Sequence, residues 1–86
     1  MVIFLHKKFK RKYEKLNSSQ KVRFKERIEI FLRDPYNSIL HNHALQGDYL
    51  GFRSINITGG LRVHYEELSS GGVLFITVGT HSELYG

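Results

Sequence analysis

The hydrophobic positions in the first third of the chain follow two different patterns. Residues 2–5 are a short apolar run that predicts a strand. Beyond this run, Phe9, Tyr13 and Leu16 recur at spacings of four and three, which indicates one buried stripe of a helix with basic residues around it. A second amphipathic helix follows, and its apolar positions are Val22, Phe24, Ile28, Phe31 and Leu32.

Short polar segments mark the ends of these two helices. Asn17-Ser18-Ser19 ends the first helix and supplies an N-cap for the second. Asp34-Pro35 ends the second helix, because residues that precede proline avoid the helical region of backbone space. The short connection between the two helices predicts that they run antiparallel, as a hairpin.

The hydrophobic period becomes two after a polar loop over residues 36–48. Residues 52–57 and 61–66 alternate apolar and polar side chains, which is typical of strands with one buried face. Residues 73–78 are apolar throughout, which favours a central strand covered on both faces. The pattern therefore predicts an α+β fold, in which an N-terminal strand precedes an antiparallel helical hairpin packed on one face of a three- to four-stranded, mainly antiparallel sheet.

The glycine-rich turns fix the register of the predicted strands. A three-residue loop pairs Asn56 with Arg62 and keeps apolar side chains on one face, whereas a two-residue loop would mix the two faces. A four-residue loop in the next hairpin pairs Leu68 with Val73. With these registers one face of the sheet collects an unusual number of polar groups: Ser54, Asn56, Arg62, His64, Thr77 and, if the chain is still extended there, His81.

The composition indicates a globular protein without cysteine chemistry. The chain has 86 residues, 41% of them hydrophobic, and we expect one domain over residues 1–86. Cysteine is absent, which excludes disulfides, thiolate zinc sites and cysteine nucleophiles and is typical of a reducing cytosol. The sequence has no leader pattern, and residues 1–5 are too few to span a bilayer, so we expect a cytoplasmic protein without a membrane partner.

Positive charge is concentrated in the helical part of the chain. The net charge is +5, but residues 1–33 hold eleven of the thirteen Lys and Arg against three Glu, a net of +8, whereas residues 34–86 have a net of −3. A basic half favours a polyanion such as RNA or DNA, a membrane surface or an acidic protein as its partner. A solvated helix face gives the same pattern, so charge alone leaves the choice open.

Several sequence blocks resemble one family of bacterial toxins. Gly-Gly-Leu-Arg-Val-His-Tyr (59–65) and Val-Gly-Thr-His-Ser-Glu-Leu-Tyr-Gly (78–86), together with the order of elements, resemble the RelE/ParE toxin superfamily. His-Ala-Leu-Gln-Gly (43–47), Gly-Phe-Arg (51–53) and Gly-Thr-His (79–81) resemble its YafQ-like branch. The resemblance implies a RelE-like fold and a toxin of a type II toxin–antitoxin pair, a class that cleaves mRNA in the ribosomal A site without a metal.

The resemblance also implies which residues act. His43 matches the family's loop histidine, His81 its C-terminal catalytic histidine, and Arg62 the arginine that holds the scissile phosphate in RelE-type members. This chain has Asn56 where the YafQ-like branch has a further histidine, so one acid–base candidate is missing, and it has Gly60-Leu61 where that branch has Asp-Trp. The residues that we expect to bind substrate are Arg53, Asn56 and Tyr85.

Two histidines and an arginine supply the types of group that metal-free cleavage of RNA requires. RNA carries its own nucleophile, the 2′-hydroxyl next to each phosphate. Histidine suits either proton transfer because its pKa lies near neutral pH, and the planar guanidinium matches phosphate oxygens. We assign Arg62 to the phosphate, His81 as the general acid and His43 as the base or an orienting group.

Each of these residues also has a purely structural interpretation. His41 and His43 can be loop residues without chemistry, and Arg62 can form a surface ion pair with Glu66 or Glu67, worth about 0–1 kcal/mol. His64 shares the polar face but matches no functional residue of the family, so we expect no role for it. His81 beside a glycine near a strand end is the least easily explained by structure alone.

A metal site is the weaker explanation of the sequence His41-Asn42-His43. Nucleases that use a His-Asn-His motif spread those residues over a hairpin and a helix, whereas here they are consecutive. Only Asp48 is near enough in sequence to serve as a carboxylate ligand beside them. We therefore predict no metal and no cofactor.

The family resemblance implies two kinds of partner. The expected partners are a cognate antitoxin that contributes an acidic, partly disordered segment, and the ribosome with its mRNA. Two alternatives keep the same scaffold. One is a ParE-like toxin that inhibits DNA gyrase without cutting RNA, and the other is a non-catalytic RNA-binding protein.

Overall fold

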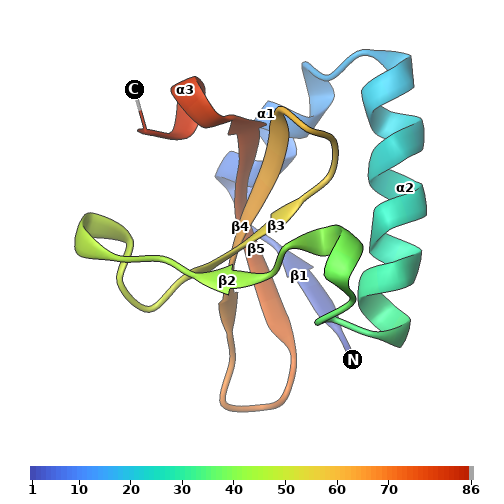
Figure 1. Cartoon of the computed structure of the whole chain (residues 1–86). Coiled ribbons are helices and arrows are strands. Elements are labelled where there is room, and N and C mark those ends of the chain that lie inside the picture. The colour runs from blue at the N-terminus through green and yellow to red at the C-terminus, as the bar shows by residue number, and fades with distance from the viewer. Residues whose placement is uncertain (86) are drawn as a thin grey trace.

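Residues 1–85 are the part of the chain that this computed structural model describes, and they form one mixed sheet flanked by helices (Figure 1). The strands are β1 (Ile3–Leu5), β2 (His43–Ala44), β3 (Arg53–Asn56), β4 (Leu61–Glu67) and β5 (Val73–Thr80). The helices are α1 (Lys7–Glu14), α2 (Ser18–Arg33) and α3 (His81–Tyr85), with short 3-10 turns at Ser38–Leu40 and Gly47–Tyr49.

The sheet has the order β1-β5-β4-β3-β2, and only β1 is parallel to its neighbour, β5. This arrangement confirms the predicted α+β fold class, with the N-terminal strand beside the strand that was expected to be central. The strand count differs slightly from the predicted three to four, because two residues of the long loop, His43 and Ala44, pair with β3 as a fifth strand.

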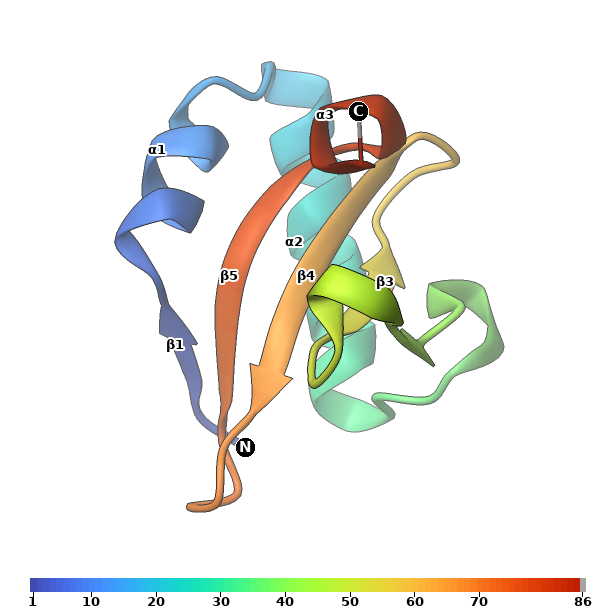
Figure 2. The ribbon, with the colours of Figure 1, turned by 90° about the vertical axis from the view of Figure 1, so that its left-hand side faces the viewer.

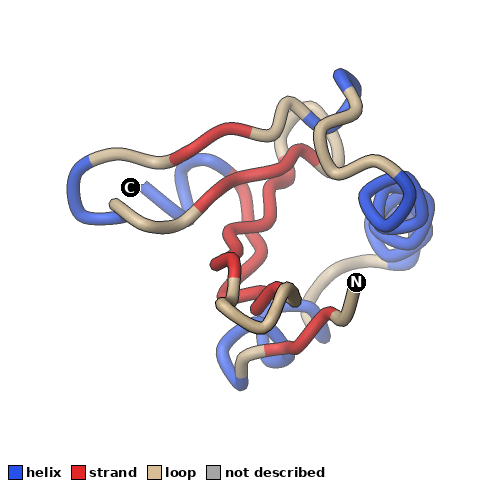
Figure 3. Tube along the Cα trace, turned by 90° about the horizontal axis from the view of Figure 1, so that it is seen from below, coloured by secondary structure: helices blue, strands red, loops and turns tan. Residues whose placement is uncertain are grey.

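The helices begin and end where local chemistry predicts. Asn17 caps α2 through a reciprocal capping box, in which its side chain accepts from the Gln20 N–H and the Gln20 side chain accepts from the Asn17 N–H. The helix ends at Arg33, just before Asp34-Pro35, as expected. α2 lies over one face of the sheet, opposite α3 (Figure 2 and Figure 3).

Aromatic side chains fill the core between the helices and the sheet. Phe9 of α1 packs on Phe75 of β5 with ring centroids 5.5 Å apart, and Phe31 of α2 packs on Phe75 at 5.9 Å. Two apolar positions assigned to α2, Val22 and Leu32, instead stay 59% and 45% exposed. The buried stripe of α2 is therefore narrower than its apolar content suggested.

The register of the β3–β4 hairpin is as predicted. Asn56 lies opposite Arg62, and Arg62 lies opposite Gly79 of β5. Alternation of apolar and polar residues was sufficient to fix these pairs, because a slip by one residue would have exchanged the two faces.

The lower part of the β4–β5 pair departs from the prediction. The register shifts by one residue just before Tyr65, so Val73 pairs with Glu67 instead of Leu68. The bulge sets Tyr65 opposite Phe75, and both side chains are buried, with exposed fractions of 1% and 0%. The bulge thus pairs two buried rings whose centroids lie 6.2 Å apart.

The polar face of the sheet is partly covered, which alternation did not predict. Ser54, His64 and Thr77 are only 0%, 1% and 6% exposed. The segment between β2 and β3, together with α3, lies in front of this face (Figure 2). Tyr49 from that segment and Tyr85 from α3 pack on the His64 ring, so only part of the face remains accessible.

The chain is helical over α3 (His81–Tyr85) and is no longer extended there. Thr80 and Glu83 form a second reciprocal cap, in which the Thr80 N–H donates to Glu83 Oε1 at 2.7 Å and the Glu83 N–H donates to Thr80 Oγ1 at 3.2 Å. The Thr80 N–H, followed by the Thr80 side chain, lowers the pKa of the Glu83 carboxyl group. The condition under which His81 would extend the polar face, a chain still extended at residue 81, is not met, because this cap turns the backbone into α3.

Candidate functional site

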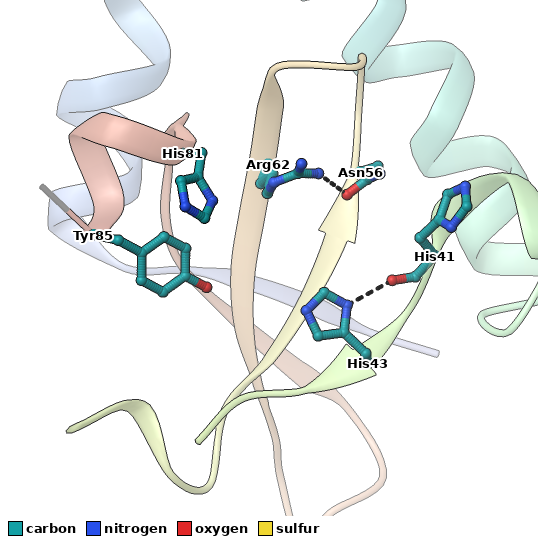
Figure 4. Close-up of a pocket in the computed structure, with 6 residues that line it drawn as sticks. All are labelled: His41, His43, Asn56, Arg62, His81 and Tyr85. Atoms are coloured by element: carbon teal, nitrogen blue, oxygen red, sulfur yellow. Dashed lines mark hydrogen bonds between the residues drawn. The ribbon is translucent and has the colours of Figure 1, made fainter. Parts of the chain in front are cut away.

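An open pocket of about 420 Å³ lies on the polar face, between the short strand β2 and helix α3 (Figure 4). Its walls come from segments that are far apart in the sequence. The pocket is lined by His41, His43, Asn56, Arg62, His81 and Tyr85.

The structure brings together five of the six residues that the sequence singled out. His43, Arg62 and His81, predicted to be catalytic, share this pocket with Asn56 and Tyr85, predicted to bind substrate. The functional roles of these five residues remain predictions.

Arg53 is the predicted residue that lies elsewhere. Its Nε donates to Asn42 Oδ1 at 2.8 Å, and its guanidinium lies 5.3 Å from the centroid of the Tyr36 ring. Asn42 in turn donates to the Tyr65 hydroxyl and to the Pro35 carbonyl oxygen. The side chain of Arg53 thus helps to fasten the long loop to the sheet, and its predicted contact with substrate stays a prediction.

Asn56 orients the arginine of the pocket. Arg62 donates through Nη1 to Asn56 Oδ1, across the β3–β4 pair (Figure 4). A guanidinium has five N–H donors, so this bond uses one of them. The hydrogen bond favours Asn56 as the partner of Arg62 over the alternative surface pair with Glu66.

A backbone contact sets the tautomer of His43. Nδ1 of His43 lies 2.8 Å from the carbonyl oxygen of His41 (Figure 4). A carbonyl oxygen only accepts, so Nδ1 must carry the proton, and neutral His43 keeps its lone pair on Nε2. His43 is thereby prepared to take up a proton at Nε2. His41 holds a left-handed backbone conformation at φ 48°.

His81 and Tyr85 share one face of α3. They are four residues apart, which places them one turn apart on the helix, and their ring centroids are 4.7 Å from each other. Tyr85 is 39% exposed, and partial burial raises the pKa of its hydroxyl further above neutral pH. The two side chains together form one wall of the pocket (Figure 4).

A buried histidine that sequence reasoning set aside supports that wall. His64 Nε2 lies 3.0 Å from the Tyr85 hydroxyl, and the Tyr49 hydroxyl donates to the Leu84 carbonyl oxygen at 2.7 Å. The Tyr49 ring packs edge-on against the ring of His64 at 5.5 Å and of Tyr85 at 5.4 Å. We call Tyr49, His64 and Tyr85 the aromatic clamp.

The environment of His64 favours its neutral form. Burial, followed by the positive charges of His43, Lys8 and Arg62, lowers its pKa from 6.5 to about 4. His64 is therefore uncharged at neutral pH and can hold the Tyr85 hydroxyl without adding charge to the pocket. Its place on the polar face was visible in the sequence, but the path of the Tyr49 segment over it was not.

The described residues contain no group of three or more His, Cys, Asp or Glu side chains arranged to hold a metal ion. Of the candidates weighed for such a group, His41 and His43 lie in the pocket, and Asp48 belongs to the 3-10 turn Gly47–Tyr49. Within residues 1–85, no helix is long and apolar enough to cross a membrane.

Comparison with known proteins identifies relatives over the whole chain. The family model for the YafQ toxin, a bacterial toxin of type II toxin–antitoxin systems, matches residues 1–86. YafQ from E. coli strain BL21(DE3) is 20% identical and superimposes with a TM-score of 0.78, covering 99% of this chain and 98% of its own. No curated protein matches.

Two further solved structures share the fold. A YoeB/ParE toxin from Agrobacterium tumefaciens is 21% identical, with a TM-score of 0.77 over 94% of this chain and 99% of its own. The matched chain in the crystal structure of the E. coli DinJ–YafQ complex is 20% identical, with a TM-score of 0.71 over 99% of this chain and 98% of the matched chain.

Proposed function

This chain belongs to the YafQ family of type II toxin–antitoxin toxins, and from this premise we propose that it is a ribosome-dependent, metal-independent mRNA endonuclease. The observation that carries the proposal is the convergence of His43, Arg62 and His81 on one open pocket. These side chains supply a base, a cation and an acid, which are the groups that cleavage of RNA by its own 2′-hydroxyl requires.

The proposed reaction is an in-line displacement at phosphorus. His43 Nε2 takes the proton of the 2′-hydroxyl, and the oxygen attacks the adjacent phosphorus. Arg62 donates to the non-bridging oxygens as negative charge develops on them. The bond from phosphorus to the 5′-oxygen breaks, and His81 gives that oxygen a proton. The products are a 2′,3′-cyclic phosphate and a 5′-hydroxyl.

The other residues of the pocket orient these groups. Asn56 cannot act as an acid or a base, but its hydrogen bond holds the Arg62 guanidinium in place. Tyr85 presents a partly exposed ring on which a base can stack, worth about 1–3 kcal/mol. The adjacent His81 is then held near the nucleotide whose 5′-oxygen leaves.

The proposed partners match the charge of the chain. DinJ–YafQ is a complex of E. coli proteins, and for the present chain we propose a cognate antitoxin with an acidic, partly disordered segment. The net charge of +8 over residues 1–33 favours such a segment and equally favours ribosomal RNA phosphates. Both partners imply action in the cytoplasm.

The test is cleavage of a defined mRNA on translating ribosomes, with 5′ ends mapped by primer extension. We expect cuts inside A-site codons that persist in EDTA and fall at least a hundredfold in His81→Ala and in Arg62→Ala. Ribosome binding without cuts would reject the nuclease and favour the non-catalytic RNA-binding alternative. Inhibition of gyrase without cuts would favour the ParE-like alternative.

A further inference from the structure

A second pocket adjoins the first along the sheet edge. It has a volume of about 210 Å³ and shares two lining residues, His41 and Asn56, with the proposed catalytic pocket. The two hollows are therefore neighbours on one continuous surface, and Asn56 lies at the boundary with its side chain turned to Arg62 (Figure 4). The full lining is Arg23, Arg27, Ile39, His41, Asn56, Ile57, Thr58 and Gly59.

Two arginines give this pocket its character. Arg23 and Arg27 come from α2 and lie four residues apart, so both project from one face of the helix. Like charges at this spacing destabilise a helix slightly, so the pair contributes nothing to the stability of α2. No Asp or Glu from residues 1–85 lines the pocket. The site therefore fits an anion with several oxygens, as a phosphate diester has.

A single RNA strand would reach this second pocket on leaving the first. Tyr85 and His81 close one side of the catalytic pocket, and the opposite side, at His41 and Asn56, leads to α2 (Figure 4). A strand whose scissile phosphate lies at Arg62 must continue in both directions. On the α2 side its next phosphate meets the arginine pair.

We propose that Arg23 and Arg27 bind the phosphate immediately 5′ of the scissile one. The inference rests on the proposed function, because the strand polarity follows from the roles of the histidines. The 2′-hydroxyl belongs to the nucleotide on the 5′ side of the cut. The general base that takes its proton, His43, lies on the side of the pocket that leads to α2. The nucleotide on the 3′ side then lies against His81 and Tyr85.

The test combines neutralised phosphates with neutralised arginines. A short oligoribonucleotide carries one 2′-deoxy sugar at the attacking position, so that it binds but cannot be cut. One version has a methylphosphonate 5′ of the scissile phosphate, and a second version has a methylphosphonate 3′ of it. Binding is measured by fluorescence anisotropy at several salt concentrations. The proteins are wild type, Arg23→Gln/Arg27→Gln, and the control Lys7→Gln/Arg11→Gln, which removes two exposed charges at the same spacing on α1.

The expected result is coupling between one phosphate and one pair of arginines. The 5′ methylphosphonate weakens binding about tenfold for the wild type and the α1 control, and less than about twofold for the α2 variant. The α2 variant also lowers the salt slope by about 0.7 for the lost phosphate contact.

Three outcomes would overturn the proposal. They are an equal loss in all three proteins, no binding of the oligonucleotide to the wild type, and coupling to the 3′ phosphate, which would reverse the polarity. Cleavage on ribosomes is measured in parallel to separate the two proposals. A wild type that cuts while the losses are additive rejects only the subsite. A wild type that never cuts but shows coupling rejects only the nuclease.

Discussion

The two faces of the sheet are built by different means, although they belong to the same strands. The face under α1 and α2 is an apolar core of aromatic rings, in which Phe9, Phe31 and Phe75 interlock. The face under α3 is held by a few directed hydrogen bonds around the buried His64. The first kind of face depends on the volume of its side chains, whereas the second depends on single hydrogen-bond donors and acceptors.

The largest expected effect is a cavity in the apolar face. Phe31 is fully buried and meets the ring of Tyr65 edge-on at 5.2 Å, so Phe31→Ala should lower the free energy of unfolding by about 3–5 kcal/mol. Urea denaturation followed by circular dichroism measures this loss. The neighbouring Leu32 is 45% exposed, and Leu32→Ala should cost less than about 1 kcal/mol. Equal losses in the two variants would contradict the description of this face.

Acid should act on the other face. The pKa of His64 is about 4 in the folded protein and 6.5 ordinarily, so between these values the unfolded chain binds more protons. The contribution of His64 to the free energy of unfolding is then fully present above about pH 6.5. It is lost as the pH falls toward 4, and the loss is about 2 kcal/mol between pH 7 and pH 5. Denaturant midpoints at these two pH values measure the change.

The matched variants separate His64 from the other histidines. His64→Leu should remove most of this pH dependence, whereas His41→Asn, which replaces an exposed histidine at a left-handed position that asparagine tolerates, should keep it. A pH dependence that survives in His64→Leu would assign the effect to another group.

The smallest expected effect tests one hydroxyl of the aromatic clamp. Tyr49→Phe removes the donor to the Leu84 carbonyl oxygen and should cost about 1 kcal/mol, with faster amide hydrogen exchange confined to α3. Tyr36→Phe, at a ring that is 60% exposed, is the control and should change neither quantity measurably. Unchanged exchange in Tyr49→Phe would mean that this hydrogen bond does not hold α3.

What the sequence could predict differs between the two faces in the same way. Hydrophobic periodicity predicted the helices, and it paired Asn56 with Arg62 because a register slip would have exposed the core. It could not predict the bulge before Tyr65, which depends on how two large rings meet across the strands. Core patterning is a local signal, whereas ring packing is a tertiary one.

The candidate site was predictable where family motifs reached and no further. The blocks around His43 and His81 named residues that do share a pocket. The sequence also contains a signal for the start of α3 that the prediction did not use, because Thr80-x-x-Glu83 is a capping-box pattern. The role of Arg53 in fastening the loop and that of Tyr49 above His64 depend on the path of the loop before β3, which no short-range pattern specifies.

The residues of the pocket lie far apart in the sequence, so the pocket is completed late during synthesis of the chain. His43 stands near the middle of the chain, whereas His81 and Tyr85 follow the last strand. All five strands must therefore have been synthesised and must have left the ribosome before His81 can lie near His43. A nascent chain that reaches only to the end of β4 carries the basic helices α1 and α2 but has an incomplete pocket.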